Sequence, residues 1–216
     1  MTWRDANRGL GEWFQRLLAQ LDPQQCLSCG QRLPRQGTGV ALHLCGACLP
    51  SWQEIRGRRC GRPFDRPVDT CGPCLLRPPP WARLVVLGDY RGPLVSLIHR
   101  FKYGGWFFLG EDLGRRLGER VRGELELDAV VPVPMAALRR LRRGFDHTAV
   151  LADAIAAELE RPVLPLLQRS WVREQVGVSA RARRRRLGIS ARRRQQLPRR
   201  VLVVDDVLTT GATLRA

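Results

Sequence analysis

The stretch that decides the fold is Val201-Leu-Val-Val-Asp-Asp-Val-Leu-Thr-Thr-Gly-Ala-Thr213. Its four consecutive apolar residues, 201–204, predict a strand that is buried on both faces, as central strands of parallel sheets are. Asp205 and Asp206 follow at the carboxyl end of this strand, where open α/β sheets bind their ligands. The small, hydroxyl-rich residues 208–213 then lead into a predicted helix. Such a loop can direct backbone N–H groups and hydroxyls at a phosphate, so the stretch predicts an α/β fold with an anion site beside two acids.

Two carboxylates beside a phosphate-binding loop suit a ligand with a diol and a phosphate on one sugar, which describes a ribose 5-phosphate. The stretch resembles the phosphoribosyl-pyrophosphate (PRPP) signature of the type I phosphoribosyltransferases. The resemblance implies that Asp205 and Asp206 are the catalytic acids and hold the ribose 2′- and 3′-hydroxyls, while Mg²⁺ arrives with PRPP. It places the 5′-phosphate on Leu208, Thr209, Thr210, Gly211, Ala212 and Thr213. The alternative is an ordinary strand, turn and helix with surface acids, and so long a composite motif disfavours it.

Length and composition suit one moderate enzyme domain with an accessory module. The chain has 216 residues, of which 44% are hydrophobic, which is enough for a core. No apolar run is long enough to span a membrane. Charged residues interrupt the first twenty residues, so residues 10–21 predict an amphipathic helix and not a signal peptide. We therefore expect a cytoplasmic protein with reduced thiols that serve as metal ligands.

The net charge of +17 invites a nucleic-acid interpretation. Lys102 is the single lysine, so the base composition of the genome offers a competing explanation for the many arginines. A polyphosphate ligand also requires a basic surface. The clustered arginines are at positions 139, 140, 142, 143, 181, 183–186, 192–194, 199 and 200. Charge alone leaves these explanations open.

The cysteines divide the chain into two parts. All seven precede the proline run at 78–80, and an α/β alternation follows it. We expect an N-terminal helix and Cys-rich module over residues 1–80 and an α/β domain over 81–216. In the second part, apolar patterns predict strands at 84–87 and 129–133 and helices at 93–101, 109–121 and 145–159.

The first four cysteines have the spacing of a zinc ribbon. Cys26-x2-Cys29 and Cys45-x2-Cys48 are separated by fifteen residues, and four thiolates make a closed, structural zinc site. The other three are Cys60, Cys71 and Cys74, which lack a fourth partner. A second zinc there requires His43, Asp65, Asp69 or water as a ligand, or the second metal is lost. The spacing does not decide which pairs share a metal.

Together the two halves resemble the ComF family (ComFC/GntX-type proteins), in which a zinc ribbon precedes a type I phosphoribosyltransferase-like domain. The motifs that carry the resemblance are the paired cysteines, Cys71-Gly-Pro-Cys-Leu-x3-Pro-Pro, Tyr90-x2-Pro-Leu-x2-Leu-Ile-x3-Lys102-Tyr, Val131-Pro-Val-Pro134, Arg143-Gly-Phe145 and the terminal signature. The family is linked in bacteria to competence and the handling of incoming DNA. The resemblance therefore implies PRPP and an unknown acceptor as ligands, and single-stranded DNA and other DNA-uptake proteins as partners.

Further site candidates surround the signature. Pro134 and Met135 leave the predicted strand where related transferases contact pyrophosphate, and guanidinium groups of Arg139 and Arg143 suit phosphate oxygens. Lys102 is a candidate from the hood of the site. Residues 175–186 resemble the mobile loop that closes over substrate in this superfamily. A solvated basic helix and an exposed lysine at a helix end are the plain alternatives.

Three departures from the family pattern bear on this interpretation, and one of them is Arg186, which stands where the family commonly has Asn. Asp146 and His147 stand where the family usually has Asn-Gln, although Asp146 can cap the next helix. Only Leu214-Arg-Ala216 follow the signature, where the family continues through a helix and a strand. We therefore expect either that the chain is truncated or that its fold is incomplete and its catalysis doubtful. Two other functions stay open: a non-enzymatic factor that handles single-stranded DNA, and a nucleotide-salvage phosphoribosyltransferase.

Overall fold

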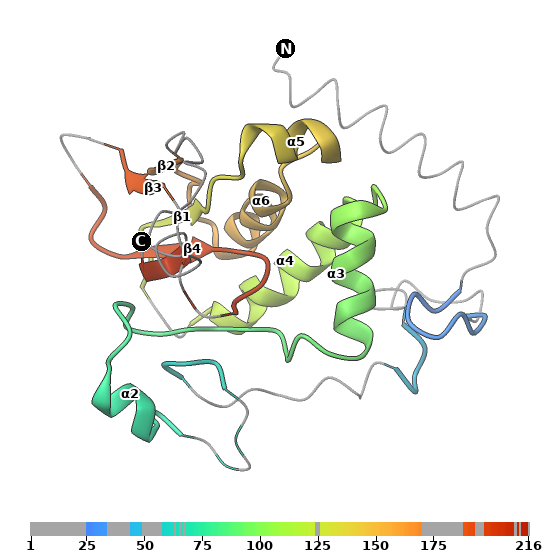
Figure 1. Cartoon of the computed structure of the whole chain (residues 1–216), viewed down its shortest axis with the longest axis horizontal. Coiled ribbons are helices and arrows are strands. Elements are labelled where there is room, and N and C mark those ends of the chain that lie inside the picture. The colour runs from blue at the N-terminus through green and yellow to red at the C-terminus, as the bar shows by residue number, and fades with distance from the viewer. Residues whose placement is uncertain are drawn as a thin grey trace, which may run out of the picture.

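The computed structural model in Figure 1 describes residues 25–33, 44–48, 58–62, 64, 66, 68–123, 126–169, 188–192, 197–209, 211 and 213–215. The predicted N-terminal helix at 10–21 and the predicted substrate loop at 175–186 lie outside these residues. So do Thr210 and Ala212 of the signature, and His43 and Asp65 as candidate metal ligands.

A parallel pair of strands carries the signature. β1 (Ala129–Pro132) and β4 (Val201–Val204) run parallel, with Ala129 opposite Val201 and Pro132 opposite Val204. Val163 adds a parallel bridge to Val130 on the other side of β1. The first three residues of β1 are at most 1% exposed, which explains their unbroken apolar sequence. The predicted strand at 129–133 and the mixed α/β class with a parallel sheet are confirmed.

Three helices pack one after another to one side of this pair (Figure 1). They are α3 (Pro93–Tyr103), α4 (Phe108–Val121) and α6 (His147–Leu159), and all three confirm the predictions to within about two residues at each end. Helix α6 packs on β1, α4 on α6, and α3 on α4. Glycines allow α4 and α6 to approach closely, because a β-carbon at Gly114 would lie 2.6 Å from Cβ of Ala154.

The remaining elements are short. Helix α2 (Gly72–Leu76) precedes these three helices in sequence, α5 (Ala137–Arg143) lies between β1 and α6, and η3 (Thr213–Arg215) is a single 3-10 turn. Strands β2 (Leu167–Arg169) and β3 (Ile189–Ala191) form an antiparallel pair. Buried residues beside the first four cysteines, such as Leu27 and Leu44, belong to the same apolar cluster as Leu97 and Leu113. The described residues around the first four cysteines therefore share a core with the helical layers.

Two predictions about strands are wrong. Residues 84–87 form no strand, because the chain bonds elsewhere: the N–H of Leu84 donates to the carbonyl of Arg58, and Arg120 donates to the carbonyl of Val86. Nor is β4 buried on both faces, since Val201 and Val203 are 38% and 37% exposed. Among the described residues, helices cover only the face that carries Leu202 and Val204, which belong to or pack on the core.

Candidate functional site

The site forms where three elements meet at the carboxyl end of β4. The strand delivers Asp205 and Asp206, the end of α3 delivers Lys102 and Tyr103, and the start of α6 delivers His147. Gly144, with φ of +80°, ends α5 in the left-handed conformation that favours glycine. The side chain of Asp146 then caps α6 by accepting a hydrogen bond of 3.2 Å from the N–H of Ala149. This confirms the capping role expected for Asp146 and turns the next side chain inward.

Asp206 is held by two partners. The Lys102 ammonium lies 2.8 Å from its Oδ1, and the Nε2 of His147 contacts its Oδ2. All three side chains are at most 13% exposed. Burial alone would raise the pKa of Asp206, but the hydrogen bond from His147 and the hydrogen bond and charge of Lys102 outweigh it and lower this pKa. Asp206 is therefore a nearly buried carboxylate whose charged form the fold stabilises.

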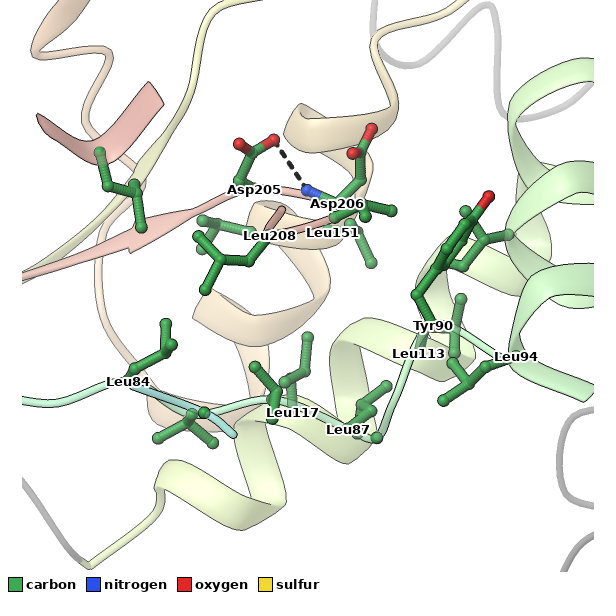
Figure 2. A pocket seen from close by; sticks show the side chains of 18 of the residues that line it. Leu84, Leu87, Tyr90, Leu94, Leu113, Leu117, Leu151, Asp205, Asp206 and Leu208 are labelled. Atoms are coloured by element: carbon green, nitrogen blue, oxygen red, sulfur yellow. Dashed lines mark hydrogen bonds between the residues drawn. The ribbon is translucent and has the colours of Figure 1, made fainter. Parts of the chain in front are cut away.

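Asp205 has a different environment. One of its oxygens accepts a hydrogen bond of 2.9 Å from the N–H of Asp206, as Figure 2 shows. No cation lies within ion-pair range of it in the part of the chain that the structure describes. Burial, and next the charge of Asp206, raise the pKa of Asp205. The pKa values of the two neighbouring acids are thus shifted in opposite directions. Such shifts are typical of functional sites and also occur in structural ion-pair networks.

Arg143 extends the network on the far side of His147. One guanidinium nitrogen lies 3.1 Å from Nδ1 of His147 and 3.9 Å from the sulfur of Met135. The other donates to the hydroxyl of Tyr103 at 3.2 Å, and the guanidinium stands 4.8 Å from the centre of the Tyr103 ring. Tyr103 follows Lys102 on α3. The contacts therefore close a ring that joins α3, the end of β4 and the start of α6.

A cavity of about 320 Å³ lies under the acids. Figure 2 shows apolar side chains around it, from the 84–90 segment, from α4 and α6, and from the loop after β4, among them Leu84, Leu113, Leu151 and Leu208. Asp205 and Asp206 border it from above. The cavity separates residues 84–87 from β4, which accounts for the absence of strand pairing between them.

The first four cysteines gather as the spacing predicts. The sulfur atoms of Cys26, Cys29, Cys45 and Cys48 all lie within 4.8 Å of one another, and those of Cys29 and Cys45 are 3.7 Å apart. A tetrahedral zinc with sulfur at 2.3 Å requires an edge of about 3.8 Å. Burial opposes ionisation of Cys26, yet hydrogen bonds from the backbone at Cys29, Cys45 and Ser28 lower its pKa to about 6. The cluster fits a metal such as zinc.

Cys60, Cys71 and Cys74 form a second cluster of three thiols, with the sulfurs of Cys60 and Cys71 at 3.6 Å. Asp69, one fourth-ligand candidate, instead pairs with Arg58 at 3.3 Å on the surface. Burial, and next the Cys71 sulfur, raise the pKa of Cys74 to about 11. Three thiols fit a metal that takes one further ligand, and no other His, Cys or acid joins the group among the described residues.

Sequence comparisons complete this picture. Competence protein F of Haemophilus influenzae is 32% identical over 203 residues, which cover 88% of this chain and 87% of that protein. The chain belongs to the ComF family. DNA utilization protein YhgH of Salmonella typhi is 32% identical over 210 residues, covering 89% and 88% of the two chains. Competence protein ComFC of Streptococcus pneumoniae is 27% identical over 209 residues, covering 88% and 90%. No family model and no solved structure matches.

In this ComF-family chain the structure gathers most of the predicted site residues. Lys102, Met135, Arg143, Asp205 and Asp206 meet in the ring or beside it, and the carbonyl of Pro134 accepts from Arg169 at 3.4 Å. Arg139 is exposed on α5. Of the signature loop, Leu208, Thr209, Gly211 and Thr213 follow the acids, and a β-carbon at Gly211 would come within 2.9 Å of the Trp81 ring.

Three residues of the network were missed by sequence reasoning. His147 was noted as a departure from the family pattern, without a contact to Asp206. Tyr103 follows Lys102 in a recognised motif, and Arg169 lies on β2. Burial, and next the charge of Arg139, lower the pKa of Arg169, while Asp205 opposes this. No described helix is long and apolar enough to cross a membrane.

Proposed function

We propose that residues 81–216 form a type I phosphoribosyltransferase-like domain that binds PRPP with Mg²⁺. The observation that carries this proposal is the pair of partly buried acids at the end of β4, whose pKa values are shifted in opposite directions, with the Thr/Gly loop after them. Carboxyl oxygens accept hydrogen bonds from hydroxyls, and Asp205 and Asp206 are our candidates for the two ribose hydroxyls. Residues 208–213 are the candidate 5′-phosphate loop.

The leaving group also has candidate ligands. Lys102 and Arg143 are cations within the ring. Arg169 donates to the carbonyl of Pro134 and interacts electrostatically with Asp205 and with Arg139. Cations of this kind suit the oxygens of a pyrophosphate. The acids also fit Mg²⁺, which binds phosphates together with one or two carboxylates. When bound, the ion would neutralise charge on the pyrophosphate as its bond to C1′ breaks.

The reaction we propose is pentosyl transfer to an acceptor whose identity is open. Pyrophosphate leaves C1′ with its bonding electrons, and a nucleophilic nitrogen of the acceptor forms the new bond. The ribose ring is positively charged between these events. The charged carboxylate of Asp206 and its neighbour Asp205 would stabilise that charge electrostatically. No residue of the network is assigned as a general base.

We place this activity in competence or DNA uptake, with DNA-uptake proteins as partners. The names of the relatives support this, because they are competence and DNA utilization proteins. We further propose that Cys26, Cys29, Cys45 and Cys48 bind a structural zinc in a module that spans residues 1–80. The second cluster is a candidate for another zinc with an open position.

Calorimetric titration of Mg²⁺ and PRPP into the full chain tests the proposal. Saturable binding by the wild type should be lost in the Asp205→Asn/Asp206→Asn double variant. Glu119→Gln is the matched control, because Glu119 is an exposed acid paired with Arg115 on α4. A double variant that binds as tightly as the wild type would contradict the assignment of the acids.

A second candidate function is a non-enzymatic factor for single-stranded DNA. The observation that favours it is α5, which buries no residue and exposes Arg139, Arg140 and Arg142 beside Leu138 and Leu141. This candidate predicts binding of an oligonucleotide that weakens steeply with salt and is reduced when these three arginines become glutamine. Binding that is absent even at low ionic strength would exclude it. Turnover of free bases would instead favour nucleotide salvage.

A further inference from the structure

His147 is a polar side chain buried at the centre of the site. It and Thr148 are the two buried polar residues of the described chain, at 5% and 3% exposure. Thr148 donates to the carbonyl of Val133 at 2.7 Å, which satisfies it within the fold. Both ring nitrogens of His147 instead contact residues of the site, Asp206 on one side and Arg143 on the other.

The chemistry of these partners fixes which nitrogen carries the proton. A guanidinium only donates, so Nδ1 of His147 must accept from Arg143 at 3.1 Å. The same guanidinium nitrogen lies farther from Nε2, at 3.4 Å. Nε2 is then the nitrogen that carries hydrogen, and it donates to Oδ2 of Asp206. The two contacts select one neutral tautomer of the imidazole.

The hydrogen bond from His147 engages the second carboxylate oxygen of Asp206. Lys102 holds Oδ1 at 2.8 Å and His147 holds Oδ2, so the Asp206 carboxylate is fixed from both sides. Asp205 receives only the N–H of Asp206 at one oxygen among the described residues. Asp205 therefore keeps an uncommitted oxygen, whereas Asp206 keeps only the remaining lone pairs of two engaged oxygens.

We propose that His147 is the positioning residue of this site, which locks Asp206 in place and leaves Asp205 as the acid that turns to the ligand. The ligand part of this inference rests on the proposed function, while the tautomer and the division between the acids do not. Gln at position 147 can reproduce the contacts, because its amide donates to a carboxylate and accepts from a guanidinium. Ala can do neither.

The first experiment needs no ligand. The chain has three histidines, at positions 43, 99 and 147, so nitrogen NMR of histidine-labelled protein is readily assigned with the His147→Gln variant. At pH 8 we expect the Nε2–H tautomer of His147. We expect Asp206→Asn to shift its nitrogen signals. A Nδ1–H tautomer, or signals that Asp206→Asn leaves unchanged, would overturn the proposal.

The second experiment measures binding of Mg²⁺ and PRPP by calorimetry. We expect His147→Ala to weaken it about tenfold, the scale of one lost hydrogen bond to a charged group. His147→Gln should stay within about threefold of the wild type on the same scale. Asp153→Ala is the matched control, because Asp153 is exposed on the same helix. Circular dichroism checks that each variant folds.

The outcomes separate the two proposals. A wild type that binds together with a His147→Ala variant that binds equally well would overturn the positioning role alone. Weakening in both Ala and Gln variants would also overturn it, because Gln preserves the hydrogen bonds. A folded wild type that does not bind would instead overturn the proposed function and the ligand part of this inference. The NMR result would still decide whether His147 fixes Asp206.

Discussion

Lys102, the single lysine of the chain, places its ammonium 2.8 Å from a carboxylate oxygen of Asp206, and both side chains are nearly buried. The contact joins the end of a helix to the end of a strand about a hundred residues away in sequence. Lys102 is therefore not an exposed lysine at a helix end, which was the plain alternative from the sequence. The ion pair is a property of the folded site, and its removal should have measurable effects on stability.

We expect Asp206→Asn to lower the free energy of unfolding by about 3 kcal/mol, because it leaves a buried Lys102 without its counter-charge. Urea unfolding at pH 7.5 measures this. The Lys102→Met/Asp206→Asn double variant should recover part of the loss, since no buried charge then remains unpaired. Glu126→Gln is the control, because its ion pair with Arg200 is exposed. Equal losses in the control would contradict the prediction.

Asp205→Asn should have the opposite effect. The raised pKa of Asp205 means that its charged form is disfavoured in the folded state, so the charge lowers stability above the folded pKa. We expect the variant to be more stable by about 1 kcal/mol at pH 8, as substitutions at functional sites often are. The gain should shrink as the pH falls toward the ordinary aspartate pKa of about 3.9. A variant that is less stable than the wild type at pH 8 would contradict this.

The pH dependence of Asp206 has the reverse sign. Its pKa is lowered by His147 and Lys102 against burial, so its contribution to stability is present above the ordinary aspartate value and is lost as the pH falls through the lower folded value. Urea unfolding from pH 7 to pH 3 should show wild type and Asp206→Asn converging at the acid end. Curves that stay parallel over this range would mean that Asp206 has the same pKa in the folded and unfolded protein, which would contradict the prediction.

Metal content separates the two cysteine clusters. We expect the purified chain to hold zinc at Cys26, Cys29, Cys45 and Cys48, and Cys26→Ser to lose it with much of the fold around Leu27 and Leu44. Elemental analysis of wild type, Cys26→Ser and Cys60→Ser measures each site. Cys60→Ser lowers the zinc content only if the three-thiol cluster binds a metal. An unchanged content in Cys26→Ser would contradict the first site.

The packing of α4 on α6 gives a test of the fold. Gly114→Ala should lower the free energy of unfolding by about 2 kcal/mol, the scale of overpacking in a core, because its β-carbon would lie 2.6 Å from Cβ of Ala154. Gly72→Ala is the control, since nothing lies within 4 Å of a β-carbon there. Thermal unfolding followed by circular dichroism compares them. A tolerated Gly114→Ala would mean that the helices are farther apart.

Much of this fold could be predicted from local pattern. The helices over 93–101, 109–121 and 145–159 have regular apolar spacing, and the strand at 129–133 is an apolar run, so periodicity located them. The 84–87 segment has the same apolar character, yet it forms no strand because a strand also requires a neighbour with free backbone groups. Its carbonyls and N–H groups bond to Arg58 and Arg120 instead. A local apolar pattern does not identify hydrogen-bond partners that lie far away in sequence.

The same limit applies to the site. Asp205, Asp206 and Lys102 stood out by sequence motif, but nothing in the sequence indicated that Lys102 and His147 share Asp206. Both contacts arise from the packing of α3 and α6 around the end of β4. The sequence predicts the cap at Asp146, but it indicates His147 only as a departure from a family pattern. The cap at Asp146 explains why His147 points inward. An N-cap motif in the sequence can suggest this orientation, but it does not identify the residue that His147 contacts.

The open face of β4 has a consequence for the motion of the site. Val201 and Val203 remain more than a third exposed, so packing restrains this strand from one side only. A strand of this kind opens locally more readily than one buried on both sides, as β1 is. The acids at its end are therefore steadied by side chains of other elements. Amide hydrogen exchange along β4 should accelerate when Lys102, Arg143 or His147 is neutralised or removed, although none of these residues belongs to the sheet.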